Sequence, residues 1–309
     1  MLSAIICTYN RAHYLRPLLE SLAAGGFADY EVVLVDNNSS DTTRAEVDRF
    51  AADHPRVQLH YCFEPQQGLS YARNRGIREA KGDILVYVDD DALVNPDYLQ
   101  TYARFFAENP EAMAAGGPIL PRYDGCEEPS WMSHYTRQLV TGKLWLGDRE
   151  REFPRGAFPG GGNAAYRRSV FDQVGLFNVE LGRKGNSLIG AEEKDLFDKM
   201  TSRGIRFYYL PTAILYHLIP PRKLTQDYFD RLTYGIGVSE RLRTRQVSQG
   251  KYFSRLCQEA VKWGGTLALW TSFALKGEVA KGNKLVAFRR NVSRGLLGRQ
   301  PRRMSAVKD

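Results

Sequence analysis

Ile84-Leu85-Val86-Tyr87-Val88-Asp89-Asp90-Asp91 is a short apolar run that ends in three consecutive acids. A run of this length is too brief for a typical helix and predicts a strand that is buried on both faces of a sheet. Residues 2–7 and 31–35 form two similar runs earlier in the chain, and polar residues follow each of them. We therefore expect three parallel strands in the first part of the sequence.

Segments with apolar residues at helical spacing separate and flank these strands. They cover residues 11–24, 42–52 and 70–81; Ser40 or Asp41 could cap the second, and Gly82 closes the third. Strands that alternate with helices predict an open α/β sheet, in which ligands bind beyond the carboxyl ends of the strands. The polar segments expected at that edge are Thr8-Tyr9-Asn10, Asp36-Asn37-Asn38 and Asp89-Asp90-Asp91.

The amino-acid composition changes after the third expected strand. Residues 116–190 are rich in Gly, Pro and aromatic residues, which favours long loops, and a helix at 192–202 and a strand at 206–210 follow. Beyond residue 225 the sequence is helical throughout. We therefore predict a catalytic domain over residues 1–225 and a helical, basic region over 226–309.

The C-terminal region contains an uncharged stretch, residues 263–275, that is shorter than the roughly 20 residues of a membrane span. The basic residues that follow are Lys276, Lys281, Lys284, Arg289, Arg290, Arg294, Arg299, Arg302 and Arg303. An interfacial helix attracted to anionic lipid fits this pattern, as does a helix that packs on the catalytic domain with a solvated basic end.

The amino-acid composition limits the kinds of binding partner and the cellular compartment that we expect for the protein. The net charge of +8 favours nucleic acid, anionic lipid or phosphorylated small molecules. Because the basic residues gather near the C-terminus without a nucleic-acid-binding motif, we expect no nucleic-acid partner. Four scattered cysteines and a first segment without a basic leader indicate reduced thiols and a cytoplasmic location.

The acidic motif is the strongest chemical signal. Three adjacent carboxylates after a buried strand repel one another, and a hard divalent cation such as Mn²⁺ or Mg²⁺ relieves that repulsion while it neutralises a departing diphosphate. Asp91 could instead cap the helix that follows. Arg73 and Arg75 lie in the preceding helical segment, where guanidinium groups suit phosphate but are also common on exposed helices.

Taken together, the motifs resemble those of family 2 inverting glycosyltransferases with the GT-A fold. The resemblance rests on Cys7-Thr8-Tyr9-Asn10-Arg11, Val35-Asp36-Asn37-Asn38-Ser39, the Ala-Arg-Asn core of residues 68–76, and Val88-Asp89-Asp90-Asp91, in the family's order over roughly the first 220 residues. It implies a Rossmann-like mixed sheet flanked by helices, a nucleotide-diphosphate sugar donor for which we expect UDP, and a glycan or lipid-linked acceptor in polysaccharide or glycolipid assembly.

The resemblance also assigns roles to residues. Thr8, Tyr9 and Asp36 would hold the base, Asp89 the ribose and Asp91 the metal. The donor-binding set that it implies is Thr8, Tyr9, Asn10, Arg11, Asp36, Arg73, Asp89, Asp90, Gly161, Gly162, Asn163 and Arg222. Within this set Asp90 is the variable middle of a DxD motif, and the glycines and Asn163 belong to a loop that resembles the family's donor-sugar loop.

Gly190-Ala191-Glu192-Glu193-Lys194-Asp195-Leu196 resembles the acidic helix start that carries the family's general base, with Ala and Glu in place of the usual Gly and Asp. Glu193 takes the base position and Glu192 supports it, although the choice between them stays open. His217, after the last expected strand, could bind the metal or the diphosphate. A catalytically silent sugar-nucleotide or glycan-binding scaffold and a nucleotidyltransferase are the alternative functions.

Overall fold

A computed structural model describes residues 1–185 and 187–299 and divides the chain into two compact units. The first unit comprises residues 1–122, 142–180 and 192–218, and the second comprises residues 123–141, 181–191 and the chain from residue 219 onward. The segments 123–141 and 181–191 thus cluster with the C-terminal helices, so the units interleave along the sequence. A single cut at residue 225 does not describe them.

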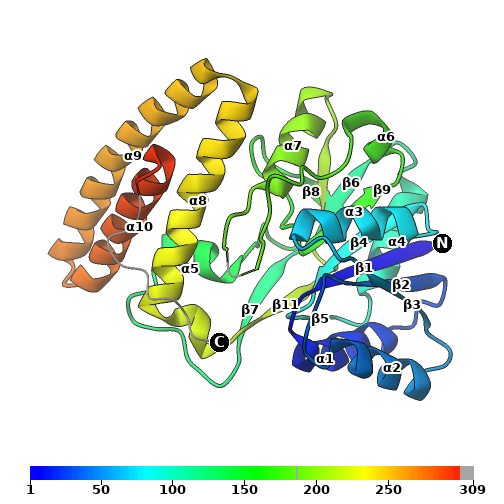
Figure 1. Cartoon of the computed structure of the whole chain (residues 1–309). Coiled ribbons are helices and arrows are strands. Elements are labelled where there is room, and N and C mark those ends of the chain that lie inside the picture. Colours follow the sequence, from blue (N-terminus) through cyan, green and yellow to red (C-terminus); the bar gives the residue numbers. More distant parts are fainter. Residues whose placement is uncertain (186, 300–309) are drawn as a thin grey trace. The chain divides into compact units, whose positions relative to one another are not determined.

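The first unit is built on a mixed sheet with the strand order β3-β2-β1-β4-β9-β6-β10-β8 (Figure 1). Its strands are β1 (Leu2–Thr8), β2 (Tyr30–Asp36), β3 (Gln58–Phe63), β4 (Ile84–Asp89), β6 (Ala114–Gly116), β8 (Arg151–Glu152), β9 (Asn163–Arg167) and β10 (Phe207–Tyr209). Strands β3, β2, β1 and β4 are parallel neighbours, whereas β9 runs antiparallel to both β4 and β6.

Helices cover both faces of this sheet, and Figure 1 shows α1 and α2 on one side of β1 to β3 and α3 on the other. The first face packs against α1 (Ala12–Ala23), α2 (Thr43–Asp53) and α4 (Tyr98–Glu108), and the second against α3 (Leu69–Glu79), α6 (Val170–Val174) and α7 (Glu192–Ser202). Alternate residues of β1 supply the two cores: Ala4 and Ile6 face the first group of helices, and Ile5 faces the second. Strands that bury both faces account for the continuous apolar runs.

The three expected strands and the helix over 192–202 are confirmed, the helix at the expected residues and the strands with ends within one residue. Strand β3 was not predicted, because this edge strand is mostly half-buried, has exposed residues at both ends and lacks a continuous apolar run. Asp41 does not form the expected simple cap. Its Oδ1 accepts from the Thr43 N–H at 3.0 Å and its Oδ2 from the Ala12 N–H at 3.0 Å, so one carboxylate serves the starts of α1 and α2.

Strand register brings the polar segments to one edge of the sheet. Thr8 at the end of β1 lies opposite Asp36 at the end of β2, and Cys7 lies opposite Asp89 at the end of β4. The antiparallel strand β9 begins at Asn163, which pairs with Val88. The glycine-rich loop therefore enters the sheet beside the acidic motif.

A small second sheet has the order β5-β11-β7, formed by β5 (Ala92–Val94), β11 (Leu215–Ile219) and β7 (Ile119–Tyr123). Strands β5 and β11 are antiparallel, and His217 lies opposite Ala92. Because Ala92 directly follows the acidic motif, this pairing brings a histidine that is far away in sequence next to Asp91.

The second unit is helical and contains α5 (His134–Thr141), the 3₁₀ turn η1 (Pro221–Leu224), α8 (Gln226–Val247), α9 (Gln249–Leu275) and α10 (Val279–Leu297). Helices α8, α9 and α10 pack against one another. Thr225 and Ser248 cap α8 and α9, where their side-chain oxygens accept backbone N–H groups at 3.3 and 3.0 Å. Among the described helices, none is long and apolar enough to cross a membrane.

Candidate active site

The acidic motif at the end of β4 is held together by a cation from the chain. Arg11, just after β1, donates through one guanidinium nitrogen to Asp90 Oδ1 at 2.7 Å and to Asp91 Oδ2 at 3.1 Å. The Thr8 hydroxyl donates to Asp90 Oδ2 at 2.8 Å. Both aspartates are buried, and they raise the pKa of Arg11 above its ordinary value, with Asp90 the stronger influence. The charge that the sequence left uncompensated is thus partly balanced by Arg11.

Asp91 also meets His217. Its Oδ1 lies 3.4 Å from His217 Nε2, and the two side chains expose only 4% and 16% of their surface. A carboxylate oxygen and an imidazole nitrogen at this separation can ligate one divalent cation, because ligand atoms about 2.1 Å from such an ion lie roughly 3 Å apart. The donor set therefore fits a Mn²⁺ or Mg²⁺ ion.

Asp89 is the exposed member of the motif. The surrounding protein removes part of its hydration, and this loss together with the charge of Asp91 raises the pKa of Asp89. The Gly162 carbonyl accepts the Asp89 N–H at 3.2 Å. A Cβ atom at Gly162 would lie 2.1 Å from Asp89 Oδ2, so only glycine permits this approach.

A second charged centre lies at the start of α7. Arg73, fully enclosed on α3, donates to Glu192 Oε1 at 2.8 Å and to Glu193 Oε1 at 2.6 Å. Its guanidinium carbon lies 5.8 Å and 5.3 Å from the ring centroids of Tyr87 and Phe177, within range of a cation–π contact. The two glutamates differ in access: the Glu192 side chain is 5% exposed and the Glu193 side chain 31%.

The glycine-rich loop touches both centres with consecutive residues. The Gly161 N–H donates to Glu193 Oε2 at 3.2 Å, and a Cβ atom at Gly161 would lie 1.7 Å from Glu193 Oε1. The next residue, Gly162, contacts Asp89. Two acids that are more than 100 positions apart in the sequence therefore face the same short stretch of backbone.

The expectation that Asn163 binds a sugar hydroxyl does not match its surroundings. The residue is fully buried; its Oδ1 accepts from the hydroxyls of Tyr98 and Tyr102 at 2.7 Å, and its Nδ2 donates to the carbonyls of Pro118 and Ala213 at 2.8 and 3.0 Å. Every polar position of the amide is used. Asn163 anchors the loop, and its partners Tyr98 and Tyr102 lie one helical turn apart on one face of α4, more than 60 positions away in the sequence.

Asp36 and Asn10 shape the edge near β2. Asp36 accepts from the Ser39 N–H and the Tyr61 hydroxyl, each at 2.8 Å, and burial together with Asp36 raises the pKa of Tyr61 to about 12. Asn10 has a positive φ of 52°, and its Oδ1 accepts the Ser40 N–H at 2.7 Å. These contacts fix the loops after β1 and β2 against each other.

The remaining predicted residues occupy different settings. Tyr9 is half-buried directly after β1. Arg222 belongs to the second unit, where it is exposed on η1. Arg302 and Arg303 of the predicted basic tail lie outside the described residues.

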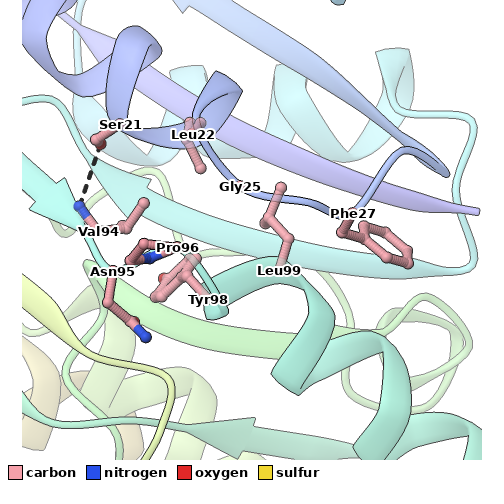
Figure 2. Close-up of a pocket in the computed structure, with 9 residues that line it drawn as sticks. All are labelled: Ser21, Leu22, Gly25, Phe27, Val94, Asn95, Pro96, Tyr98 and Leu99. Atoms are coloured by element: carbon pink, nitrogen blue, oxygen red, sulfur yellow. Dashed lines mark hydrogen bonds between the residues drawn. The ribbon is translucent and has the colours of Figure 1, made fainter.

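Two other places in the first unit, a pocket and a group of potential metal-ligand residues, lack the features of a catalytic site. A small pocket (Figure 2) is lined by Ser21, Leu22, Gly25, Phe27, Val94, Asn95, Pro96, Tyr98 and Leu99, and it offers no carboxylate or basic side chain for a metal or phosphate. His60, Cys62 and Glu79 place potential metal-ligand atoms within 4.8 Å of one another on β3 and α3. Arg75 Nε lies 2.7 Å from Glu79, so a cation already balances that carboxylate.

Known proteins share this fold and sequence pattern. The profile of glycosyl transferase family 2 matches residues 3–175. A glucosyl-dolichyl phosphate glucuronosyltransferase of Haloferax volcanii is 28% identical over 251 residues, which cover 78% of this chain and 76% of the relative.

Solved structures agree on the fold. A mannosyltransferase of Pyrobaculum calidifontis, solved with GDP-Man and Mn²⁺, superposes with a TM-score of 0.62 at 18% identity over 97% of this chain and 88% of that one. TarS residues 1–349 of S. aureus, solved with UDP, gives 0.53 at 18% identity over 99% and 94%. The chain therefore belongs to glycosyl transferase family 2 and is a nucleotide-sugar glycosyltransferase with the GT-A fold.

Proposed function

We propose that this glycosyltransferase inverts the anomeric configuration of the sugar and that Glu193 is its general base. The observation that carries the proposal is the setting of the Glu193 carboxylate. Arg73 and the Gly161 N–H hold it at 2.6 and 3.2 Å, yet about a third of the side chain remains open to an incoming acceptor. Glu192 is enclosed and serves to hold Arg73.

The contacts of Glu193 suit a single displacement. Arg73 and the Gly161 N–H orient the carboxylate that must accept a proton from the acceptor hydroxyl. The hydroxyl oxygen then attacks the anomeric carbon as the bond to the diphosphate breaks, and the diphosphate leaves with the bonding electrons. No covalent enzyme intermediate forms, so no activated nucleophilic side chain is required.

Asp91 and His217 would hold a Mn²⁺ or Mg²⁺ ion, which supplies positive charge to the leaving diphosphate. Arg11 adds a fixed positive charge beside the same acids. The presence of Mn²⁺ in the Pyrobaculum structure supports a divalent ion as cofactor.

The donor is a nucleoside-diphosphate sugar, and we propose a UDP-sugar. The edge formed by Thr8, Tyr9 and Asp36 would receive the base, and the exposed carboxylate of Asp89 would receive the ribose. Both oxygens of Asp36 already accept one hydrogen bond each, and each keeps a second lone pair for a ligand. Asn163 is no longer assigned to the donor.

The acceptor is a glycan or a lipid-linked saccharide, in polysaccharide or glycolipid assembly. The Haloferax relative is named for a dolichyl-phosphate-linked acceptor, which supports the lipid-linked choice. We place the reaction in the cytoplasm, with the enzyme peripherally bound to the membrane that carries such an acceptor.

The decisive experiment measures binding of UDP, GDP and their sugar conjugates by calorimetry, with Mn²⁺, Mg²⁺ or EDTA. We expect metal-dependent binding of one nucleotide by the wild type, its loss in Asp91→Ala, and its retention in Asp48→Ala, which removes an exposed aspartate from α2. NMR of the product then reports the anomeric configuration.

Other outcomes point to the alternative functions. Nucleotide binding without sugar transfer to any acceptor would favour a sugar-nucleotide-binding scaffold, and release of pyrophosphate would favour nucleotidyl transfer. Retention of configuration would contradict the role of Glu193 as base in a single displacement.

A further inference from the structure

Helix α9 has its polarity reversed with respect to an ordinary surface helix. Its inward face carries the ion pair between Arg255 and Glu259, 2.9 Å apart and each less than 10% exposed. The indole N–H of Trp263 also points inward, donating to Ser293 Oγ of α10 at 2.9 Å. Polar groups that a surface helix normally turns to water are here enclosed within the helical unit.

The outward face of α9 is apolar. Phe253, Val261, Leu267 and Leu275 are 68%, 76%, 53% and 85% exposed. Of the other exposed residues between Phe253 and Leu275, one group lies to one side of this face: Ser254, Gln258, Lys262, Gly265 and Ser272. The four apolar residues share their own side of the helix with residues that are small or weakly polar: Cys257, Ala260, Gly264, Ala268 and Thr271. At about 100° per residue all of these fall within an arc of roughly 120°, which we call the α9 stripe.

Charge on the exposed surface of α9 has one sign. Lys251 and Lys262 on the helix and Lys276 at its C-cap are exposed and lie along one flank of the α9 stripe at helical spacing. Glu259, the acid that this helix carries, is buried and balanced by Arg255 and Arg289. The exposed charge that α9 itself contributes along this flank is therefore positive.

We propose that the α9 stripe lies flat on an anionic lipid bilayer, with its apolar side chains in the interface and its lysines at the headgroups. An apolar arc beside a basic flank is the pattern of helices that lie in the membrane plane. Anionic headgroups are attracted to the lysines. This inference gives the proposed membrane location a definite surface and does not depend on the sugar chemistry.

A second copy of the chain fits the α9 stripe less well than a lipid bilayer does. From Phe253 to Leu275 the stripe is about 33 Å long and, at a helix width of about 10 Å, offers on the order of 300 Å². A stable interface needs about 800 Å² from each partner. Two stripes packed together would also bring their lysine flanks near each other, and like charges repel.

The test is co-sedimentation of the full chain with two kinds of vesicle: phosphatidylcholine alone, and phosphatidylcholine with about 30% phosphatidylglycerol. The second kind supplies the anionic headgroups that attract basic residues near the membrane surface. We expect binding to the anionic vesicles, weakened by salt. Phe253→Ser/Val261→Ser/Leu267→Ser should lower the affinity by on the order of 100-fold. Leu176→Ser/Val179→Ser/Leu242→Ser, which removes exposed apolar residues elsewhere, should leave it unchanged.

A second readout uses Cys257, which is exposed on the stripe. Burial raises the pKa of the Cys7 and Cys62 thiols to about 12 and 11, so in a Cys126→Ser background a polarity-sensitive fluorophore should label Cys257 first. We expect its emission to shift to the blue on anionic vesicles. Lys251→Gln/Lys276→Gln should reduce binding, whereas Lys81→Gln/Arg56→Gln should not.

Equal binding by the stripe variant and its control, or no shift at Cys257, would overturn the proposal. A dimer in light scattering without lipid that the stripe variant abolishes would show that a second copy covers the stripe. Sugar transfer to a water-soluble acceptor should be unchanged in the stripe variant, so failure of the membrane proposal can be told from failure of the transferase mechanism.

Discussion

Each unit contains a network of buried arginines and glutamates, and the two networks differ in whether a glutamate remains accessible to solvent. In the first unit Arg73 holds Glu192 and Glu193, and the Glu193 side chain remains 31% exposed. In the helical unit Arg243, Arg255 and Arg289 surround Glu240 and Glu259, and both glutamates are at least 90% enclosed.

This difference in accessibility indicates a catalytic role for the first network and a structural role for the second. A carboxylate that is oriented by an arginine and a backbone N–H, but still reachable from solvent, can exchange a proton with a substrate. A carboxylate that is buried between two arginines, as Glu240 and Glu259 each are, can only hold helices in register, and removing one partner leaves an uncompensated charge. Changes in the first network should therefore alter turnover, and changes in the second should alter stability.

The largest effect is expected for Glu193→Gln. Loss of the general base should lower kcat about 1,000-fold, while the melting temperature stays close to that of the wild type because the amide can still accept from Arg73. Steady-state kinetics and calorimetry measure the two quantities, with Glu180→Gln as the control at an exposed glutamate. A variant with normal turnover would remove Glu193 from the mechanism.

Glu259→Leu should show the opposite pattern. It leaves Arg255 and Arg289 without their shared carboxylate and should cost about 3 kcal/mol, a fall of roughly 6 to 12 °C in melting temperature. Glu278→Leu, at a more exposed glutamate, should shift it far less. If the folded Glu259→Leu protein loses turnover on a soluble acceptor below its melting range, the enclosed network also serves catalysis.

Gly161→Ala tests the steric link between the loop and the base. The added methyl group meets the end of a flexible side chain, so Glu193 should move while the fold persists. A shift of about 1 Å in a reacting group lowers kcat on the order of 100-fold. Gly26→Ala, where nothing lies within 4 Å of the added atom, is the matched control in the same kinetic assay. Unchanged kcat would show that the position of Glu193 tolerates such a shift.

Ala191 precedes α7 with a φ of +75°, in the left-handed region that favours glycine. Ala191→Gly should therefore raise the free energy of unfolding by about 1 kcal/mol, which corresponds to 2 to 4 °C in melting temperature. Turnover should change less than about two-fold, because glycine adopts the same φ. Thermal melts provide the measurement, and a drop in stability would contradict the strain argument.

The smallest effect concerns Lys284, a buried cation of α10 whose Nζ lies 3.9 Å from the Trp131 ring centroid. Burial lowers its pKa, although Asp230 partly opposes this. At pH values between the lowered pKa of Lys284 in the folded protein and its unfolded pKa near 10.4, the unfolded chain binds more protons than the folded chain. The contribution of Lys284 to the free energy of unfolding therefore rises with pH in that window.

Lys284→Met should consequently be more stable than the wild type at pH 7 by less than about 1 kcal/mol, and the advantage should shrink as pH approaches 10.4. Melts at several pH values measure the difference. A wild type that is more stable at pH 7 would show that the ring contacts outweigh the loss of hydration.

The sequence by itself determined the parallel strands β1, β2 and β4, the helices between them and the acids at their ends. Each of these depends on local patterns: apolar runs that only a buried strand accommodates, and turn and cap residues beside them. It also indicated the acidic start of α7, since three carboxylates in a first helical turn are a local signal. The edge strand β3 escaped because it lacks such a run.

Only the tertiary structure decided which charges meet. Arg73 pairs with Glu193, 120 positions away. The loop around Asn163 predicted a ligand contact, but the side-chain amide oxygen of Asn163 accepts hydrogen bonds from Tyr98 and Tyr102 instead. The apolar stretch of α9 was visible in the sequence, but its outward direction depends on Arg255 and Glu259 pairing inward. Contacts between distant segments follow from the packing of the whole chain, and spacing along the sequence carries no record of them.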